Sequence, residues 1–282
     1  MNKKQISRVL LALAFAGAGA TAQASSTWAF TGVTTTDGAN ATTSYSATDG
    51  TLNISGGYIA SGASSITAGN ANSTLLHYSG GLGMGSDGTT APNHAIDNVG
   101  NKEMVLLSFS QSVVLTSVGI GYWSGDADVS VFRLNSTTAP TLSGTTATAA
   151  GLTAAGWTLV GNYGDLQTDT TSPYTAINGA TSTGVTGSTP TVTSSSVGSS
   201  WWLIMAYNST LAGTTAKSGT LSDSDDYFKL FGVTTSVCSG SAATDCGSTT
   251  TKKVPEPASL ALASIALVGV AGIRRRRTKA AA

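Results

Sequence analysis

Acidic residues recur in three short stretches of this chain, each beside an apolar, strand-like segment. The stretches are Asp97-Asn98, Asp126-x-Asp128 and Asp223-x-Asp225-Asp226. Carboxylate and amide oxygens are hard ligands that suit calcium. Neither Asp126-x-Asp128 nor Asp223-x-Asp225-Asp226 fits the twelve-residue calcium loop of a helix-loop-helix site. We expect a structural calcium site with contributions from Asp97, Asn98, Asp126 and Asp128, and no other cofactor. Solvated acidic turns are the alternative interpretation.

Residues suited to nucleophilic catalysis are scarce. Such chemistry needs a nucleophile, a base within hydrogen-bond reach and an orienting group. The chain has two histidines, His77 and His94, and no Gly-x-Ser-x-Gly turn. We expect His77 to be a half-exposed strand residue, and His94 to lie in a turn with its imidazole bonded to the backbone. The sequence therefore predicts no catalytic residues and a protein that is not an enzyme.

Aromatic residues offer a second kind of site. Adjacent Trp201 and Trp202 must point to opposite sides of a strand, so one belongs to the core and the other is exposed or covered by a loop. Trp123 precedes Ser124-Gly125-Asp126, where an aromatic face with polar neighbours could meet a polysaccharide. Trp123 is therefore a candidate glycan-binding residue, and core packing is the alternative for each tryptophan.

The charge distribution limits the class of partner. The whole chain has a formal net charge of zero, but residues 25–251 contain 4 basic and 13 acidic residues. An acidic body repels a phosphate backbone, and no basic patch with interleaved aromatic residues is present. Nucleic acid is therefore excluded as the expected partner, whereas calcium and other cations are favoured.

The N-terminus has the pattern of a secretory signal peptide. Basic residues precede the apolar stretch Val9–Ala20, and Ala22-Gln23-Ala24 follows as a small-x-small cleavage site. Cleavage by a signal peptidase after Ala24 would leave Ser25 as the first mature residue. An uncleaved N-terminal anchor is the alternative.

The C-terminus has three consecutive parts. An apolar run, Ala258–Ile273, would extend about 24 Å as a helix, somewhat short of a hydrocarbon core near 30 Å. The cluster Arg274, Arg275, Arg276 and Arg277 would stop transfer and stay on the cytoplasmic side. Before the run, the prolines of the motif Val254, Pro255, Glu256 and Pro257 keep the backbone extended and accessible to a processing enzyme.

This tail resembles the PEP-CTERM sorting domain, over residues 254–279. The resemblance implies that the chain is the substrate of an exosortase, a membrane-embedded cysteine protease or transpeptidase of Gram-negative bacteria. It also implies an inner-membrane intermediate and a final location at the cell surface or outside the cell. An ordinary tail anchor with a chance Pro-Glu-Pro is the alternative.

The exported body, residues 25–235, reads as one all-β domain. Short apolar or alternating runs recur between turn-forming residues, without sustained helical periodicity. We expect an antiparallel β-sandwich of jelly-roll type. Its candidate strands are Trp28–Val33, Leu52–Ile59, Thr74–Tyr78, Met104–Phe109, Val113–Trp123, Val129–Leu134, Trp157–Tyr163, Trp201–Tyr207 and Tyr227–Val233.

Two polar tracts accompany this domain. Residues 178–200 are rich in Ser and Thr and predict a long loop, and residues 236–253 predict a Ser/Thr-rich stalk. Cys238 and Cys246 lie in this stalk, and in an oxidising compartment we expect them to form a disulfide that closes a small loop.

The middle of the chain, about residues 74–233, also resembles a block found in exosortase-dependent surface proteins. The resemblance carries no known activity and bears on class and location alone. It rests on Tyr78–Gly83, Pro92–Asn98, Met104–Phe109, Val118–Trp123, Asp126–Val131, Gly156–Leu159 and Asp226–Leu230.

We therefore expect an exported surface or extracellular-matrix protein with a structural or adhesive role in the envelope or biofilm matrix. A carbohydrate-binding module, stabilised by calcium and bound to exopolysaccharide, is the alternative. A secreted hydrolase ranks third.

Overall fold

The computed structural model describes most of the predicted exported domain. It covers residues 25–30, 38–41, 44–47, 50–69, 75–88, 90–136, 138–166, 174–176 and 197–238. The predicted signal peptide, most of the Ser/Thr-rich loop, the stalk beyond Cys238 and the sorting tail with its predicted membrane helix lie outside these residues. Within these ranges, no helix has the length and apolar character needed to cross a bilayer.

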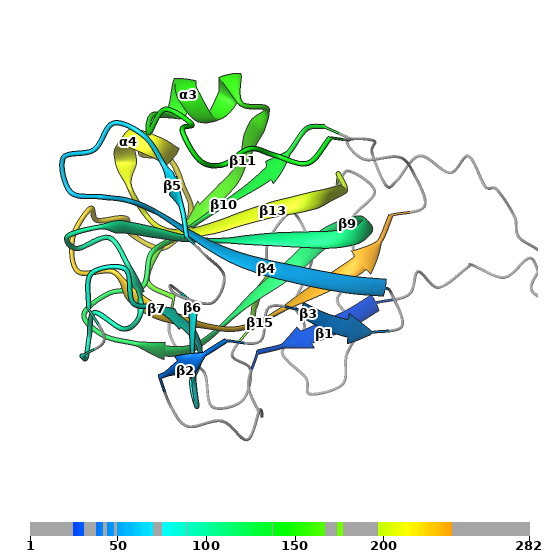
Figure 1. The fold of residues 1–282 in the computed structure, drawn as a ribbon, viewed down its shortest axis with the longest axis horizontal. Helices are drawn as coiled ribbons and strands as arrows, with labels where there is room; N and C mark the ends of the chain where they lie inside the picture. Colours follow the sequence, from blue (N-terminus) through cyan, green and yellow to red (C-terminus); the bar gives the residue numbers. More distant parts are fainter. Residues whose placement is uncertain are drawn as a thin grey trace, which may run out of the picture. The chain divides into compact units, whose positions relative to one another are not determined.

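Strands make up most of the described chain, with two short helices (Figure 1). The helices are α3 (Ala149–Ala154) and α4 (Ser209–Ala212). The strands are β1 (Ser25–Ala29), β2 (Ala39–Asn40), β3 (Ser44–Ala47), β4 (Gly50–Ile59), β5 (Thr67–Ala68), β6 (Leu75–Tyr78), β7 (Gly81–Met84), β8 (Ile96–Asp97), β9 (Lys102–Trp123), β10 (Val129–Leu134), β11 (Trp157–Tyr163), β12 (Tyr174–Ala176), β13 (Ser199–Ala206), β14 (Ala216–Ser218) and β15 (Tyr227–Val237).

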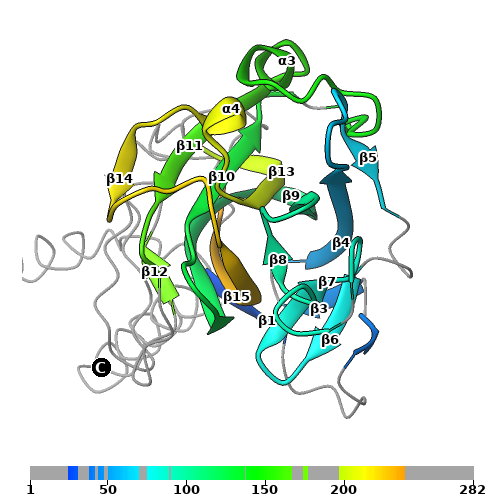
Figure 2. The same ribbon diagram turned by 90° about the vertical axis from the view of Figure 1, so that its left-hand side faces the viewer.

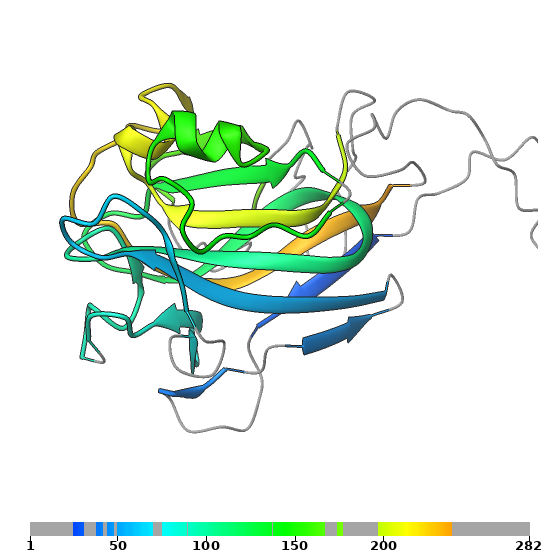
Figure 3. The same cartoon turned by 45° about the horizontal axis from the view of Figure 1, so that its top comes forward.

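Strand β9 organises the sheet because it is long enough to pair with different partners along its length. Its first part lies between β4 and β13, with Leu107 opposite both Ile54 and Trp202. Its second part pairs with β15 on one edge and β12 on the other. Met104–Phe109 and Val113–Trp123, predicted as two strands, are thus one continuous strand (Figure 3).

The all-β prediction is confirmed, and the predicted strand pairing needs one correction. Beyond β13 the order continues through β10 and β11 to β14, and all the strands belong to one sheet. Strands β11 and β14 run parallel, so this sheet is mixed rather than wholly antiparallel. Strand β14 follows α4 in the chain and lies beside β11 at the edge of the sheet, where it runs in the same direction as β11. The finer assignment to a two-sheet jelly-roll sandwich remains a prediction.

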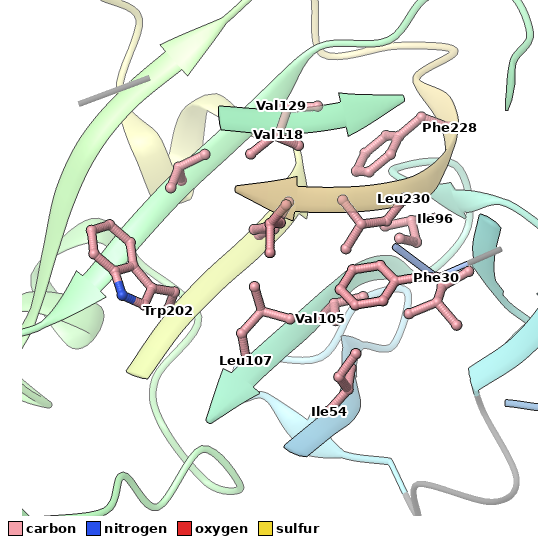
Figure 4. Packing of buried hydrophobic residues seen from close by; sticks show 14 of the residues in the cluster. Phe30, Ile54, Ile96, Val105, Leu107, Val118, Val129, Trp202, Phe228 and Leu230 are labelled. Atoms are coloured by element: carbon pink, nitrogen blue, oxygen red, sulfur yellow. The ribbon is translucent and has the colours of Figure 1, made fainter. Parts of the chain in front are cut away.

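Two hydrophobic cores lie on opposite faces of the first part of β9, as alternation of side chains along a strand requires. Val105, Leu107 and Trp202 belong to the larger core, which also includes residues of β15 (Figure 4). Met104 and Leu203 belong to the smaller core, to which α3 and α4 contribute Leu152, Leu211 and Ala212. The two helices lie near each other at the top of Figure 2. Trp201 and Trp202 point to opposite sides of the strand as expected, but both pack on a core: Trp202 is fully buried in the larger one, and Trp201 is partly buried against the smaller one rather than exposed or covered by a loop.

The first and last strands of the domain lie side by side. Strand β1 pairs antiparallel with β15, with Ser25 opposite Ser236 and Ala29 opposite Gly232. The indole N–H of Trp28 donates to the Thr235 hydroxyl at 2.9 Å. The domain therefore begins and ends at the same end of β15, and Asp226 precedes the opposite end of this strand.

Candidate functional site

Asp126, Asp128 and Asp226 converge next to the first residue of β15. Each offers a carboxylate oxygen, and these three atoms lie within 4.8 Å of one another. Asp126 forms a short parallel bridge with Asp226, because its N–H donates to the Asp225 carbonyl and its carbonyl accepts from the Tyr227 N–H. The three carboxylates thus lie where the segment between β9 and β10 runs beside the start of β15.

Two tight turns allow this crossing. Gly125 has a φ of +70°, and a Cβ there would lie 2.8 Å from the Asp225 carbonyl oxygen. Asp225 itself has a φ of +63°, a conformation that Asp and Asn tolerate better than most residues. The turn at Trp123–Asp126 therefore packs directly against the turn at Asp225-Asp226.

Backbone amides hold the two buried carboxylates in place. Asp128 accepts from the N–H groups of Asp165, at 2.8 Å, and Ser222, at 2.7 Å. Asp226 accepts from the Asp128 N–H at 2.7 Å and from the Asn98 side-chain amide. Both carboxylates are fully buried. Their orientation is therefore fixed by segments from four different parts of the chain.

Burial and mutual repulsion disfavour the charged forms of these acids. Burial is the main cause that raises the pKa of Asp226 to about 8, and the Asp128 and Asp126 carboxylates add to it. The pKa of Asp128 is raised by the same kinds of cause, with Asp126 and Asp165 as the neighbouring charges. A bound cation would reverse this balance, because it favours ionised carboxylates. The three carboxylates offer oxygen ligands of the type that calcium binds.

The four predicted calcium ligands separate into two places. Asp126 and Asp128 lie in this group, and Asn98 joins it through its bond to Asp226 and a second one to the Tyr207 carbonyl at 2.9 Å. Asp97, the last residue of β8, belongs elsewhere, because its N–H donates to Glu103 and its carboxylate accepts from the Val99 N–H. Asp226 was missing from the predicted set, although the Asp223-x-Asp225-Asp226 spacing had marked its stretch. Calcium binding itself stays a prediction.

Asp97 and Glu103 form a second buried acidic pair. Glu103 accepts from the hydroxyl and N–H of Ser86, at 2.6 and 3.2 Å, and from the Asp97 N–H at 3.3 Å. Asp97 Oδ1 accepts from the Val99 N–H at 2.9 Å, whereas its buried Oδ2 has no hydrogen-bond partner among the described residues. Burial, reinforced by nearby carboxylates, raises the pKa of Asp97 to about 8 and that of Glu103 to about 9.

His94 lies among aromatic residues rather than with the acids. His94 packs against Tyr78, with ring centroids 4.6 Å apart, and against Tyr122 at 6.0 Å. The Lys229 ammonium lies over the same two tyrosine rings, 4.0 and 4.4 Å from their centroids. His77 on β6 is 3% exposed, so the expectation of a half-exposed residue was wrong. Strand β6 is buried along its whole length between β7 and β2.

Trp123, the candidate glycan-binding residue, lies at the end of β9 and is 36% exposed. Three other tryptophans, at positions 28, 157 and 202, are buried. Core packing thus accounts for these three, and Trp123 remains available on the surface three residues before Asp126. Glycan binding by Trp123 stays a prediction.

Cys238 is the last described residue and is buried beside Gly198 and the bend of β9. Its N–H donates to the Ser112 carbonyl at 2.9 Å. A Cβ on Gly198 would lie 2.8 Å from the Cys238 sulfur, so only glycine leaves room here. Cys246 lies outside the described residues, and the disulfide stays a prediction.

The tail supplies the identification that the domain does not. Residues 253–277 match the family model of the PEP-CTERM protein-sorting motif. The chain carries a PEP-CTERM sorting signal. The match confirms the resemblance to the PEP-CTERM sorting domain, which was based on Val254–Pro257, the apolar run and Arg274–Arg277. A PEP-CTERM signal implies export, exosortase processing and membrane-associated sorting to the cell surface. No curated protein and no solved structure matches the chain.

Proposed function

We propose that this PEP-CTERM protein is a structural or adhesive component of the envelope or biofilm matrix of a Gram-negative bacterium. The sorting motif at residues 253–277 is the observation that supports this proposal, because such a signal delivers its domain to the cell surface. The domain suits a mechanical role. Its long central strand is paired on both edges in two stretches, by β4 and β13 over Met104–Ser108 and by β15 and β12 over Ser117–Gly119, and a hydrophobic core lies on each face of its first part.

Processing is tested by replacing Pro255, Glu256 and Pro257 with alanine. We expect full-length protein to accumulate in the inner membrane, because the apolar run and arginine cluster still hold the tail while the exosortase no longer recognises it. A matched variant with Thr249, Thr250 and Thr251 replaced by alanine changes the same number of residues just before the motif, and should be processed normally. Normal release of the Pro-Glu-Pro variant would contradict the proposal.

Carbohydrate binding is the second candidate function, and one observation favours it. Trp123 exposes an aromatic face at the end of β9 beside hydroxyl and carboxylate groups, which is the composition of many sugar-binding surfaces. In this proposal calcium held by Asp126, Asp128 and Asp226 would fix the Ser124–Asp128 segment that follows Trp123. The ligand would be an exopolysaccharide of the matrix.

A pull-down with matrix polysaccharides compares the wild-type protein with Trp123→Ala and Leu159→Ala. Leu159 on β11 is the matched control, because it is 37% exposed and lies away from the acidic residues. Loss of retention in Trp123→Ala alone supports binding at this face. Equal retention of all three proteins, or none by any, would exclude this site. Turnover of a polysaccharide or peptide would instead favour the secreted hydrolase.

A further inference from the structure

A small pocket lies at the rim of the smaller core, lined by the end of β4 and the turn after it, the start of β9, and α4. Its volume is about 170 Å³. Pockets that enclose drug-sized ligands measure roughly 300–1,000 Å³, so this one has room for a single small unit rather than an extended chain. The lining residues that matter for binding are Ile59, Ser61, Lys102, Asn208, Thr210 and Leu211.

Hydrogen bonds within the protein fix the walls of this pocket. In the turn after β4, the Ser61 N–H donates to the Asn101 side-chain oxygen at 3.2 Å. In α4, the Leu211 N–H donates to the Asn208 carbonyl at 3.0 Å. The pocket is therefore formed before any ligand arrives, as most small-molecule sites are.

One cation lies beside the apolar base of the pocket. The base consists of Ile59 and Leu211, which are 6% and 2% exposed and belong to the smaller core. Lys102 is opposite Ile59 across the pairing of β9 with β4, so both side chains lie on the same face of the sheet. The Lys102 ammonium donates to the Gly100 carbonyl at a long 3.4 Å and has no ion-pair partner among the described residues. It is the only ionisable group in the lining, which favours an anionic ligand.

The Asn208 side chain supplies the polar contacts. It is half-buried at the start of α4 but makes no capping hydrogen bond, and no bond joins its carboxamide to another described residue. A free carboxamide can both donate and accept, as sugar hydroxyls do. The residues Ser61 and Thr210 add hydroxyl groups to the lining. A bare phosphate would leave the apolar base without contact, and an amino acid would need an acidic partner that this lining lacks.

We propose that this pocket binds one sugar acid unit, a hexuronate, either free or at the end of a polysaccharide chain. Its carboxylate pairs with the Lys102 ammonium, its hydroxyls bond to the Asn208 carboxamide, and the C–H face of its ring packs on Ile59 and Leu211. The proposal goes beyond the carbohydrate binding proposed for Trp123, because Trp123 does not line this pocket.

The test is a ligand-observed NMR titration of the full-length protein, purified in detergent, with D-glucuronate. D-Glucose is the matched neutral ligand, because it lacks the carboxylate. The pocket variants are Lys102→Met, which removes the charge, and Asn208→Asp, which keeps the side-chain shape and a good helix-capping residue but repels a carboxylate. Lys217→Met is the matched control, because it removes the same charge from exposed strand β14, outside the pocket. The urea midpoint of each variant shows that it is folded, and Asn208→Asp decides the test if Lys102→Met is not.

We expect wild type and Lys217→Met to bind glucuronate equally. Lys102→Met and Asn208→Asp should bind it at least about tenfold more weakly, and wild type should bind glucose more weakly than glucuronate by a similar factor, because a charge-assisted hydrogen bond is lost in each case. Tighter binding of a disaccharide that ends in glucuronate would support a polysaccharide end as the ligand, and weaker binding would support the free sugar acid.

Three results would overturn the proposal. The first is no glucuronate binding by wild type, or unchanged binding by the folded pocket variants. The second is equal affinity for inorganic phosphate, which would show a general anion site. The third is loss of binding in Trp123→Ala with normal binding in the pocket variants, which would move the ligand to the surface of the second candidate function and leave that function intact.

Discussion

Buried Glu103 gives the domain a pH-dependent stability that can be isolated with one substitution. Glu103→Gln keeps the size of the side chain and its bonds from Ser86 while removing the ionisable group. In the unfolded chain Glu103 loses its proton near pH 4.5, whereas burial raises its folded-state pKa to about 9. Between these values the folded protein holds one proton more than the unfolded chain, so a rise in pH favours unfolding.

The size of the effect follows from the proton linkage. One proton contributes about 1.4 kcal/mol per pH unit to the free energy of unfolding. Between pH 6 and pH 8 the wild type should therefore lose about 3 kcal/mol more through this group than Glu103→Gln does. That difference is a large part of the roughly 5–15 kcal/mol by which domains are stable. Below pH 4.5 the two proteins should converge, because Glu103 is then protonated in both states.

Urea unfolding of the purified protein, followed by tryptophan fluorescence from pH 4 to pH 9 in the presence of a chelator, measures this difference. The chelator removes divalent cations that would hold the carboxylates ionised. Asp225→Asn serves as control, because it removes an exposed carboxylate from the same end of the domain and keeps a residue that tolerates positive φ. Parallel pH profiles for wild type and Glu103→Gln would refute the argument.

Three further predictions concern the acidic group, the core and a turn. Calcium should raise the melting midpoint of wild type but not that of Asp226→Asn, whose carboxylate is part of the buried group; identical midpoints with calcium and with chelator would remove the site. Trp202→Ala should lower the free energy of unfolding by about 3–5 kcal/mol, because Trp202 is fully buried, while exposed Trp123→Ala should stay within about 0.5 kcal/mol; similar losses for both would contradict the placement of Trp202. Gly81→Ala should destabilise the domain by about 1 kcal/mol or more, because Gly81 has a φ of +115° and a Cβ would lie 2.3 Å from the Leu230 carbonyl oxygen; an unchanged urea midpoint would refute the close approach of β7 to β15.

Period-two alternation and turn residues were enough to predict the principal strands. Val129–Leu134 and Trp157–Tyr163 appear with the predicted bounds, because each is flanked by turn residues that end it. The joining of two predicted strands into β9 was not visible. The polar Ser110-Gln111-Ser112 segment between them reads as a turn, whereas in the structure it continues the strand through the bend.

Short strands escaped prediction because their signal is tertiary. Strands β8 and β14 have two and three residues, too few for any periodicity, and they exist because β15 and β11 offer backbone partners. The same limit applied to the acidic site. Asp126 and Asp128 were identified from their spacing, but Asp226 meets them only because β15 begins where the segment after β9 passes. The sequence separates these residues by about a hundred positions.

The sorting motif was predictable because its information is local. A Pro-Glu-Pro motif, an apolar run and an arginine cluster follow one another within 24 residues, and no tertiary contact is needed to identify them. The arrangement of Trp123 and the acidic residues has the opposite character, since it depends on how segments far apart in the sequence pack together.

Mass spectrometry of the protein recovered from outside the cell reports both ends of the chain at once and therefore tests export and exosortase processing together. We predict an N-terminus at Ser25 and a C-terminus trimmed at or near residues 254–257, with the apolar run and arginine cluster removed. An intact chain recovered from the cytosol, with Met1 and Ala282 both present, would contradict it.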